Sequence, residues 1–162
     1  MISRDRDAAG RARNDRPRDR LGRPLPPGSA GVARIPDDLE LGPQQTLTFA
    51  QQLLDDGLAF NAHEVLEAAW KNGPVAERML WQGLAQYAVG ITHIQRGNAK
   101  GAGTLLRRAG ERLGAYPANA QQHDVDRAGL IAHAEALLAA LGTGSPIPDD
   151  QLRPRLRREP TT

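Results

Sequence analysis

The chain has 162 residues, of which 40% are apolar and only 4% aromatic, and this is enough for one hydrophobic core. It has no cysteine, which excludes disulfides, thiolate nucleophiles and cysteine-ligated zinc and predicts a cytoplasmic location. The formal net charge is only +2, but the first 34 residues hold nine arginines and four aspartates. This mixed charge, in a segment without aromatic residues for base stacking, argues against nucleic-acid binding.

The sequence also predicts neither export nor membrane insertion. The first 20 residues alternate Arg with Asp and lack the apolar run of a secretory signal. The most apolar stretch, residues 79–94, is interrupted by two glutamines and a histidine and falls short of the roughly 20 apolar residues of a membrane span. All but two of the 21 basic residues are arginines, the exceptions being Lys71 and Lys100, which is typical of a G+C-rich bacterial genome.

Periodicity divides the chain into three parts. Residues 1–42 are rich in Arg, Gly and Pro without helical spacing, which predicts an extended basic arm that apolar residues could pin to the helices. Residues 43–142 repeat apolar side chains at three- and four-residue steps, which predicts a helical bundle domain. Short connections make sequential helices antiparallel, so we expect an all-α, compact bundle of about five antiparallel helices. Residues 143–162 are predicted to form a short polar tail.

Capping and stop signals locate the helix ends. The predicted helices lie between Pro43 and Gly57, Asn61 and Gly73, Pro74 and Gly97, Asn98 and Leu113, and Asp124 and Gly142. Asn61 is expected to cap the second helix, with Glu64 completing a capping box. Glycines inside the third and fourth helices disfavour helix formation, so they predict that another helix approaches the backbone closely; they are Gly83, Gly90, Gly101 and Gly103.

Three polar or amphipathic side chains share one side of the second helix. His63 and Glu67 are four residues apart, with Cβ atoms about 6 Å apart, and Trp70 follows three residues later. An imidazole and a carboxylate together suit zinc, manganese or iron. A structural or catalytic zinc site needs at least three protein ligands, so this helix alone is insufficient.

The third helix is predicted to supply the missing ligand. Gln82, Gln86 and His93 fall on one flank of this helix, which would face the second helix in an antiparallel pair. We therefore predict His63, Glu67 and His93 as the metal ligands. Trp70, Gln82, Gln86 and Asn98 are predicted to line the pocket or to orient a ligand or a water.

Each of these features also has a purely structural interpretation. His63 and Glu67 could form an ordinary hydrogen-bonded pair one turn apart, and Trp70 could belong to the core. His93 and the glutamines could satisfy one another inside the bundle. The run His63-Glu64-Val65-Leu66-Glu67 only echoes the H-E-x-x-H pattern of zinc proteases, because Glu64 has a capping role and no further protease-like ligand follows.

The segments 60–70, 80–88 and 93–102 together resemble the domain of unknown function 309 family of prokaryotic proteins. That family's motif is His, three residues, Glu, two residues, then Trp or Tyr, and His63, Glu67 and Trp70 fill it. The resemblance spans roughly residues 46–113, and residues 20–26 look like an extension present in some members. It implies an all-α fold and a metal-binding motif, with no established reaction.

Two classes of function follow. The first is a metal-binding protein, extending to a metal-dependent hydrolase in which a metal-bound water is activated. The second is a protein-interaction or oligomer-forming helical module in which the polar cluster only fixes helix register. Trp81, Leu84, Ala85 and Ala88 loosely follow helical-pair repeats, which favours a protein partner or a second copy of the chain.

Overall fold

The computed structural model describes residues 17–36 and 38–158 and confirms the all-α prediction. Within these residues the chain forms five α-helices. The other secondary structure in these residues consists of two short 3-10 turns and two isolated β-bridges. The helices are α1 (Pro43–Asp55), α2 (Ala59–Asn72), α3 (Arg78–Gln95), α4 (Ala99–Ala115) and α5 (Arg127–Thr143). The 3-10 turns are η1 (Val75–Glu77) and η2 (Asp149–Leu152).

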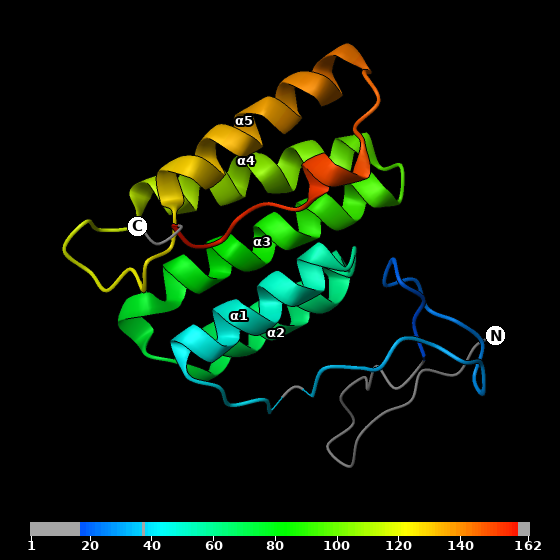
Figure 1. Cartoon of the computed structure of the whole chain (residues 1–162), viewed down its shortest axis with the longest axis horizontal. Coiled ribbons are helices and arrows are strands. Elements are labelled where there is room, and N and C mark those ends of the chain that lie inside the picture. Colours follow the sequence, from blue (N-terminus) through cyan, green and yellow to red (C-terminus); the bar gives the residue numbers. More distant parts are fainter. Residues whose placement is uncertain (1–16, 37, 159–162) are drawn as a thin grey trace.

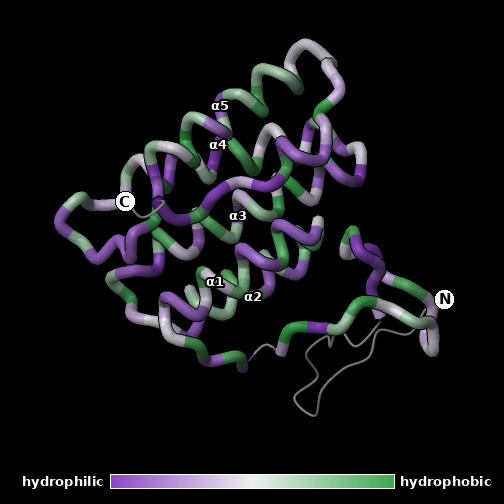
Figure 2. Tube along the Cα trace, viewed as in Figure 1, coloured by the Kyte–Doolittle hydropathy of each residue, from purple (hydrophilic) through white to green (hydrophobic). Residues whose placement is uncertain are grey.

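The central helix of the bundle is α3, which packs against α2 on one side and α4 on the other (Figure 1). Helix α1 covers α2, and α5 covers α4. Hydrophobic and hydrophilic residues alternate along the helices, as expected for elements with one buried face (Figure 2). No helix in the described ranges is both long and apolar enough to cross a membrane.

The α3–α4 contact confirms the interpretation of the glycines in α3. A Cβ atom at Gly90 would lie 2.9 Å from the side chain of Leu106, and one at Gly83 would lie 3.2 Å from the side chain of Leu113. Both leucines are fully buried. The missing side chains therefore let α4 approach the backbone of α3.

Several predicted helix ends are confirmed. Pro43 is in the first turn of α1, and the side chain of Asn98 accepts a hydrogen bond of 3.1 Å from the amide of Gly101 as the cap of α4. Gly57 and Gly97 follow α1 and α3 with a φ of 76° each, a conformation that glycine adopts without strain. The third predicted helix opens with η1 before α3 begins.

Two predicted caps are wrong. Helix α2 begins after Leu58, so Asn61 lies in its first turn, where the side-chain amide donates to the carbonyl of Ala33 in the arm at 3.2 Å. The cap of α5 is Asp126 and not Asp124, which has a φ of 63° in the preceding loop. In both places a contact with a distant segment outweighs the local signal.

The described parts of both chain ends pack against the bundle. In the arm, the backbone carbonyl of Leu21 accepts a 2.8 Å hydrogen bond from Arg96 Nε at the end of α3. Near the other end, the amide of Leu156 donates to Gln51 of α1 at 2.9 Å, and its carbonyl accepts from the amide of Asp126 at 2.8 Å. Leu156 is buried in the core.

Candidate functional site

His63, Glu67 and Lys71 form a continuous row along α2. His63 Nε2 lies 2.9 Å from Glu67 Oε2, and Lys71 Nζ lies 2.7 Å from Glu67 Oε1. The hydrogen bond from His63, supported by that from Lys71, lowers the pKa of the Glu67 carboxyl to about 2 against the opposing effect of burial. Both carboxylate oxygens therefore have a cationic or hydrogen-bonding partner within the same helix.

The ring of His63 is held at both nitrogens. Its Nδ1 lies 3.1 Å from the backbone carbonyl oxygen of Phe60, while its Nε2 faces Glu67. Both acceptors are oxygen atoms, so both contacts are hydrogen bonds only when each nitrogen carries a proton. An Nδ1–H bond to a carbonyl is also the contact that orients metal-binding histidines, so a metal ion could reach Nε2 by displacing the proton shared with Glu67.

His93 makes a different set of contacts. Its Nδ1 lies 3.1 Å from Asn98 Nδ2, whose amide group also caps α4. Burial, with a smaller contribution from the charge of Arg96, lowers the pKa of His93. Within residues 17–36 and 38–158, no three His, Asp or Glu side chains come together as a group that could hold a metal ion. The structure therefore pairs His63 with Glu67 and leaves His93 outside this pair.

The remaining predicted pocket residues are distributed over several contacts. Trp70 is half-buried against the core, with the Lys71 ammonium 5.9 Å from its ring centroid. Gln86 Oε1 accepts a 3.0 Å hydrogen bond from Arg112 Nε of α4, and Gln82 is half-buried on α3. Gln86 thus ties α3 to α4.

The N-terminal arm adds a cationic arrangement around Phe60. The guanidinium carbon of Arg18 lies 5.1 Å from the Phe60 ring centroid, and that of Arg96 lies 5.9 Å from it. The His63 ring is also near, with centroids 5.2 Å apart. A Cβ atom at Gly22 would lie 2.2 Å from the Phe60 ring, so only glycine fits where the arm crosses it.

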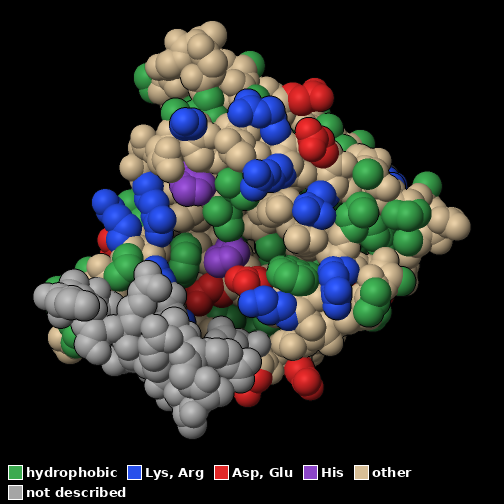
Figure 3. All heavy atoms as spheres, turned by 180° about the vertical axis from the view of Figure 1, so that it is seen from behind, with side chains coloured by type: hydrophobic (Ala, Val, Ile, Leu, Met, Phe, Trp, Pro, Cys, Tyr) green, Lys and Arg blue, Asp and Glu red, His purple; other side chains and the backbone are tan. Residues whose placement is uncertain are grey.

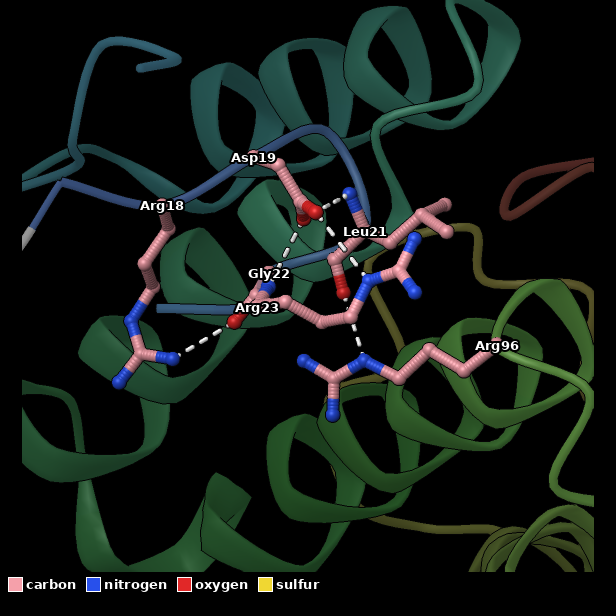
Figure 4. A network of polar contacts seen from close by, with 6 residues as sticks. All are labelled: Arg18, Asp19, Leu21, Gly22, Arg23 and Arg96. Carbon is pink, nitrogen blue, oxygen red and sulfur yellow. Dashed lines mark hydrogen bonds and ion pairs between the residues drawn. The ribbon is translucent and has the colours of Figure 1, made fainter. Parts of the chain in front are cut away.

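A tight turn presents this part of the arm (Figure 4). Asp19 Oδ1 accepts hydrogen bonds of 2.9 Å from the amides of Leu21 and Arg23. Arg18 Nη1 donates to the carbonyl of Gly22 at 2.6 Å, and Arg96 Nε donates to the adjacent carbonyl of Leu21. Two arginines from distant parts of the chain therefore hold neighbouring peptide groups.

A groove of about 340 Å³ lies between the end of the arm, α2 and the start of α3. Most of its lining is apolar and two of its residues, Glu40 and Glu77, are acidic. The full lining consists of Leu39, Glu40, Leu41, Pro43, Thr46, Val65, Ala68, Ala69, Asn72, Gly73, Pro74, Glu77 and Trp81. Its volume falls in the range of ligand-binding clefts.

A second His–Glu pair lies beneath this groove. His123 Nε2 is 2.7 Å from Glu77 Oε1, with only 10% and 14% of the two side chains exposed. Trp81 Nε1 donates to the same Glu77 oxygen at 3.2 Å. His123 and Asp124 both have positive φ values, 51° and 63°, so a strained backbone holds the imidazole in place.

Sequence reasoning missed the residues that join distant segments. Nothing in the spacing of Glu77 and His123, 46 residues apart, indicates that they meet. Arg18 and Arg96 likewise belong to a segment predicted as an arm and to the end of a helix. A partial signal was available in Gly22, because a glycine followed two residues later by a proline, Pro24, indicates a turn.

The charges of the surface are uneven. Seen from behind, the molecule presents histidine side chains on a face where basic side chains surround them and acidic side chains lie close by (Figure 3). The mostly apolar groove, which contains Glu40 and Glu77 and no Lys or Arg, and this largely basic face therefore differ in the charge that each would attract.

Residues 47–105 match the model of the family described as "Domain of unknown function (DUF309)". This confirms the family prediction and covers the His63–Glu67–Trp70 motif and Trp81, while His123 and the arm lie outside the matched range. No curated protein and no solved structure gives a significant match to the chain.

Proposed function

We propose that this chain, which belongs to the DUF309 family through residues 47–105, is a helical interaction module that binds an apolar segment of a partner protein in the groove beside Trp81. One observation carries the proposal. In the described residues, three large hydrophobic residues are exposed to solvent: Leu41, Val75 and Met79, with 37%, 74% and 39% of their surface accessible. Leu41 lines the groove, and the other two flank its lining residue Glu77 in sequence.

The position of these side chains supports binding because exposed apolar groups beside a preformed cleft mark interaction sites more often than isolated ones do. The residues whose spacing suggested a helical-pair repeat are buried in the core; they include Trp81, Leu84 and Ala88. Trp81 reaches the groove only as part of its wall. A partner would therefore contact the rim and fill the cleft instead of packing along α3.

Charge defines the expected partner. The lining contains no Lys or Arg, and its exposed acid is Glu40, since Glu77 is nearly buried and pairs with His123. A segment with one or two apolar anchors next to a Lys or Arg would match both the apolar wall and the Glu40 carboxylate. We therefore propose that the occupant is a short apolar segment with flanking basic residues, from a different protein.

The test is selection of peptides from a random phage-displayed library on the purified full chain. Enriched peptides should pair apolar residues with Lys or Arg, and Ala69→Leu, which narrows the groove, should weaken their binding at least about tenfold. Ala136→Leu places the same side chain on an exposed position of α5 and is the matched control, with binding unchanged.

Two results would overturn this proposal. One is the absence of enrichment, or peptides whose affinity is the same for the wild type and Ala69→Leu. The other is a dimer, seen by analytical ultracentrifugation, that dissociates in Val75→Asp, because the exposed apolar residues would then serve a second copy of the chain.

A second candidate function is binding of zinc, manganese or iron by His63 and Glu67, and one observation favours it. The Nδ1 contact of His63 with Phe60 aims Nε2 at the carboxylate, as in metal-binding histidines. Lys71 opposes binding, because a metal ion would have to compete with its ammonium for the carboxylate. With two protein ligands, water or a third side chain would have to complete the coordination, and hydrolytic chemistry would depend on such a water.

Titration of the metal-free full chain with zinc, monitored by calorimetry, tests the second candidate. Stoichiometric binding that is lost in Glu67→Gln and kept in Glu135→Gln, an exposed acid on α5, would support it. Equal binding by the wild type and Glu67→Gln would eliminate it. Manganese and iron(II) are tested in the same way.

A further inference from the structure

The arginines gathered around Phe60 are not explained by the groove or by the His63–Glu67 pair. Arg18 comes from the arm and Arg96 from the residue after α3, yet both guanidinium groups lie against the same ring. Each donates one hydrogen bond to a backbone carbonyl of the turn, through Arg18 Nη1 and Arg96 Nε. A guanidinium has five N–H donors, so most of the donors on these two groups are not used by the turn.

One of these donors is buried without an acceptor. Arg18 Nε is shielded from solvent and makes no hydrogen bond in the described structure. A buried, charged donor without an acceptor costs free energy, and the charge of an anion bound to the outer nitrogens of the same guanidinium would offset part of this cost.

The electrostatic balance around Arg18 points the same way. Burial lowers the pKa of Arg18, and the charges of Arg34 and Arg96 lower it further, while Glu64 acts in the opposite direction. Arg34 and Arg96 are thus both close enough to repel the charge of Arg18, against one carboxylate, Glu64, that favours it. Asp19 does not offset this repulsion, because it binds Arg23 and two backbone amides of the turn.

We propose that Arg18 and Arg96 form a binding site for a phosphate group at the edge of Phe60, where the arm crosses α2. Arg34 adds positive charge close to Arg18. Guanidinium groups match the geometry of phosphate oxygens and bind them through charge-assisted hydrogen bonds. The phosphate would accept from the Nη atoms of Arg18 and Arg96 that the turn leaves unused in the described structure. Glu64 is the carboxylate that acts on Arg18 and would partly oppose a bound anion, whereas the Glu67 carboxylate is ion-paired with Lys71.

The ligand is either inorganic phosphate or a small phosphate monoester, because both present the same dianionic group. Calorimetric titration of the full chain with sodium phosphate, corrected with sodium chloride of equal ionic strength, should give saturable binding. A parallel titration with glycerol 3-phosphate separates the two sources: comparable affinity assigns the site to a monoester, and much weaker binding assigns it to the free ion.

Variants locate the site. Arg18→Gln and Arg96→Gln should each weaken phosphate binding at least about tenfold, since each removes charge-assisted hydrogen bonds. Arg23→Gln is the matched control, because Arg23 lies in the same turn but pairs with Asp19, and its binding should stay within about twofold of the wild type.

A further variant separates ligand binding from docking of the arm. Arg34 acts on Arg18 through charge alone, so Arg34→Gln should weaken phosphate binding while hydrogen exchange at the amides of Leu21 and Gly22 stays unchanged. The proposal is overturned if the heat released on titration with sodium phosphate equals that released with sodium chloride of the same ionic strength. It is also overturned if Arg34→Gln binds like the wild type while Arg96→Gln loses both binding and amide protection, because undocking of the arm then explains the loss.

Discussion

The molecule contains two His–Glu pairs that differ in almost every physical respect. His63 and Glu67 lie one turn apart in α2, with 20% and 32% of their side chains exposed. His123 and Glu77 come from a loop and a 3-10 turn 46 residues apart, and they are nearly buried. The first pair is produced by one helix, whereas the second exists only because the tertiary structure brings two segments together.

The comparison shows that the pair that is easier to recognise in the sequence is not the pair that stabilises the fold more. The more exposed pair, His63–Glu67 (hereafter the exposed pair), belongs to a recognisable motif, but water and ions reach its half-buried side chains and reduce its contribution to stability. The buried pair has no motif in the sequence. Its carboxylate, Glu77, accepts from both His123 and the Trp81 indole N–H away from solvent, where a polar group without a partner is costly. The buried pair also supports the wall of the groove through Trp81.

The largest expected effect is at the buried pair. Glu77→Ala should lower the free energy of unfolding by about 3 kcal/mol, because it leaves His123 and the Trp81 indole N–H without an acceptor. Urea unfolding monitored by circular dichroism measures this change. Glu40→Ala, an exposed acid in the same groove, is the control and should change stability by less than about 0.5 kcal/mol. Equal losses in both variants would contradict the account.

A smaller effect is expected at the exposed pair. Glu67→Ala should cost less than about 1 kcal/mol, since it removes two screened contacts within one helix. The difference between this variant and the wild type should shrink further in 1 M salt, about ten times the ionic strength of ordinary buffers. A loss as large as that of Glu77→Ala would erase the contrast between the two pairs.

The smallest effect is expected in the pH dependence of the exposed pair, because solvent reaches the Glu67 side chain, which is 32% exposed, and screens the contacts that lower its pKa. The folded-state pKa of Glu67, about 2, is below its ordinary value of 4.5. The ionised carboxylate therefore stabilises the fold fully above about pH 4.5 and loses this contribution as the pH falls towards 2. Carboxyl carbon NMR titration should show this low midpoint, raised more by His63→Gln than by Lys71→Met. The reverse order would show that Lys71 and not His63 dominates.

Local features of the fold could be predicted from the sequence. The helical periodicity, the Asn98 cap and the close contact at Gly90 depend on residues near one another in the chain or on the absence of a side chain. The His63–Glu67 contact follows directly from helix geometry. For these features, one segment of the chain contains the whole physical cause.

The other features depend on segments that meet only after folding. Asn61 is not a cap, because α2 begins at Ala59; its side-chain NH2 group donates to Ala33 of the arm. Asp124 is not a cap, because α5 begins at Arg127; its backbone carbonyl accepts from the amide of Arg158 at 3.0 Å. Periodicity gives no information about such partners, and the cluster at Phe60 was missed for the same reason.

The most direct test of the account compares the two regions in one binding measurement. A peptide selected on the wild-type chain is titrated against Ala69→Leu, in the groove, and His63→Ala, in the exposed pair. The account predicts at least about a tenfold loss of affinity in Ala69→Leu and no change in His63→Ala. Loss of binding in His63→Ala with full affinity in Ala69→Leu would contradict it and place the function at the exposed pair.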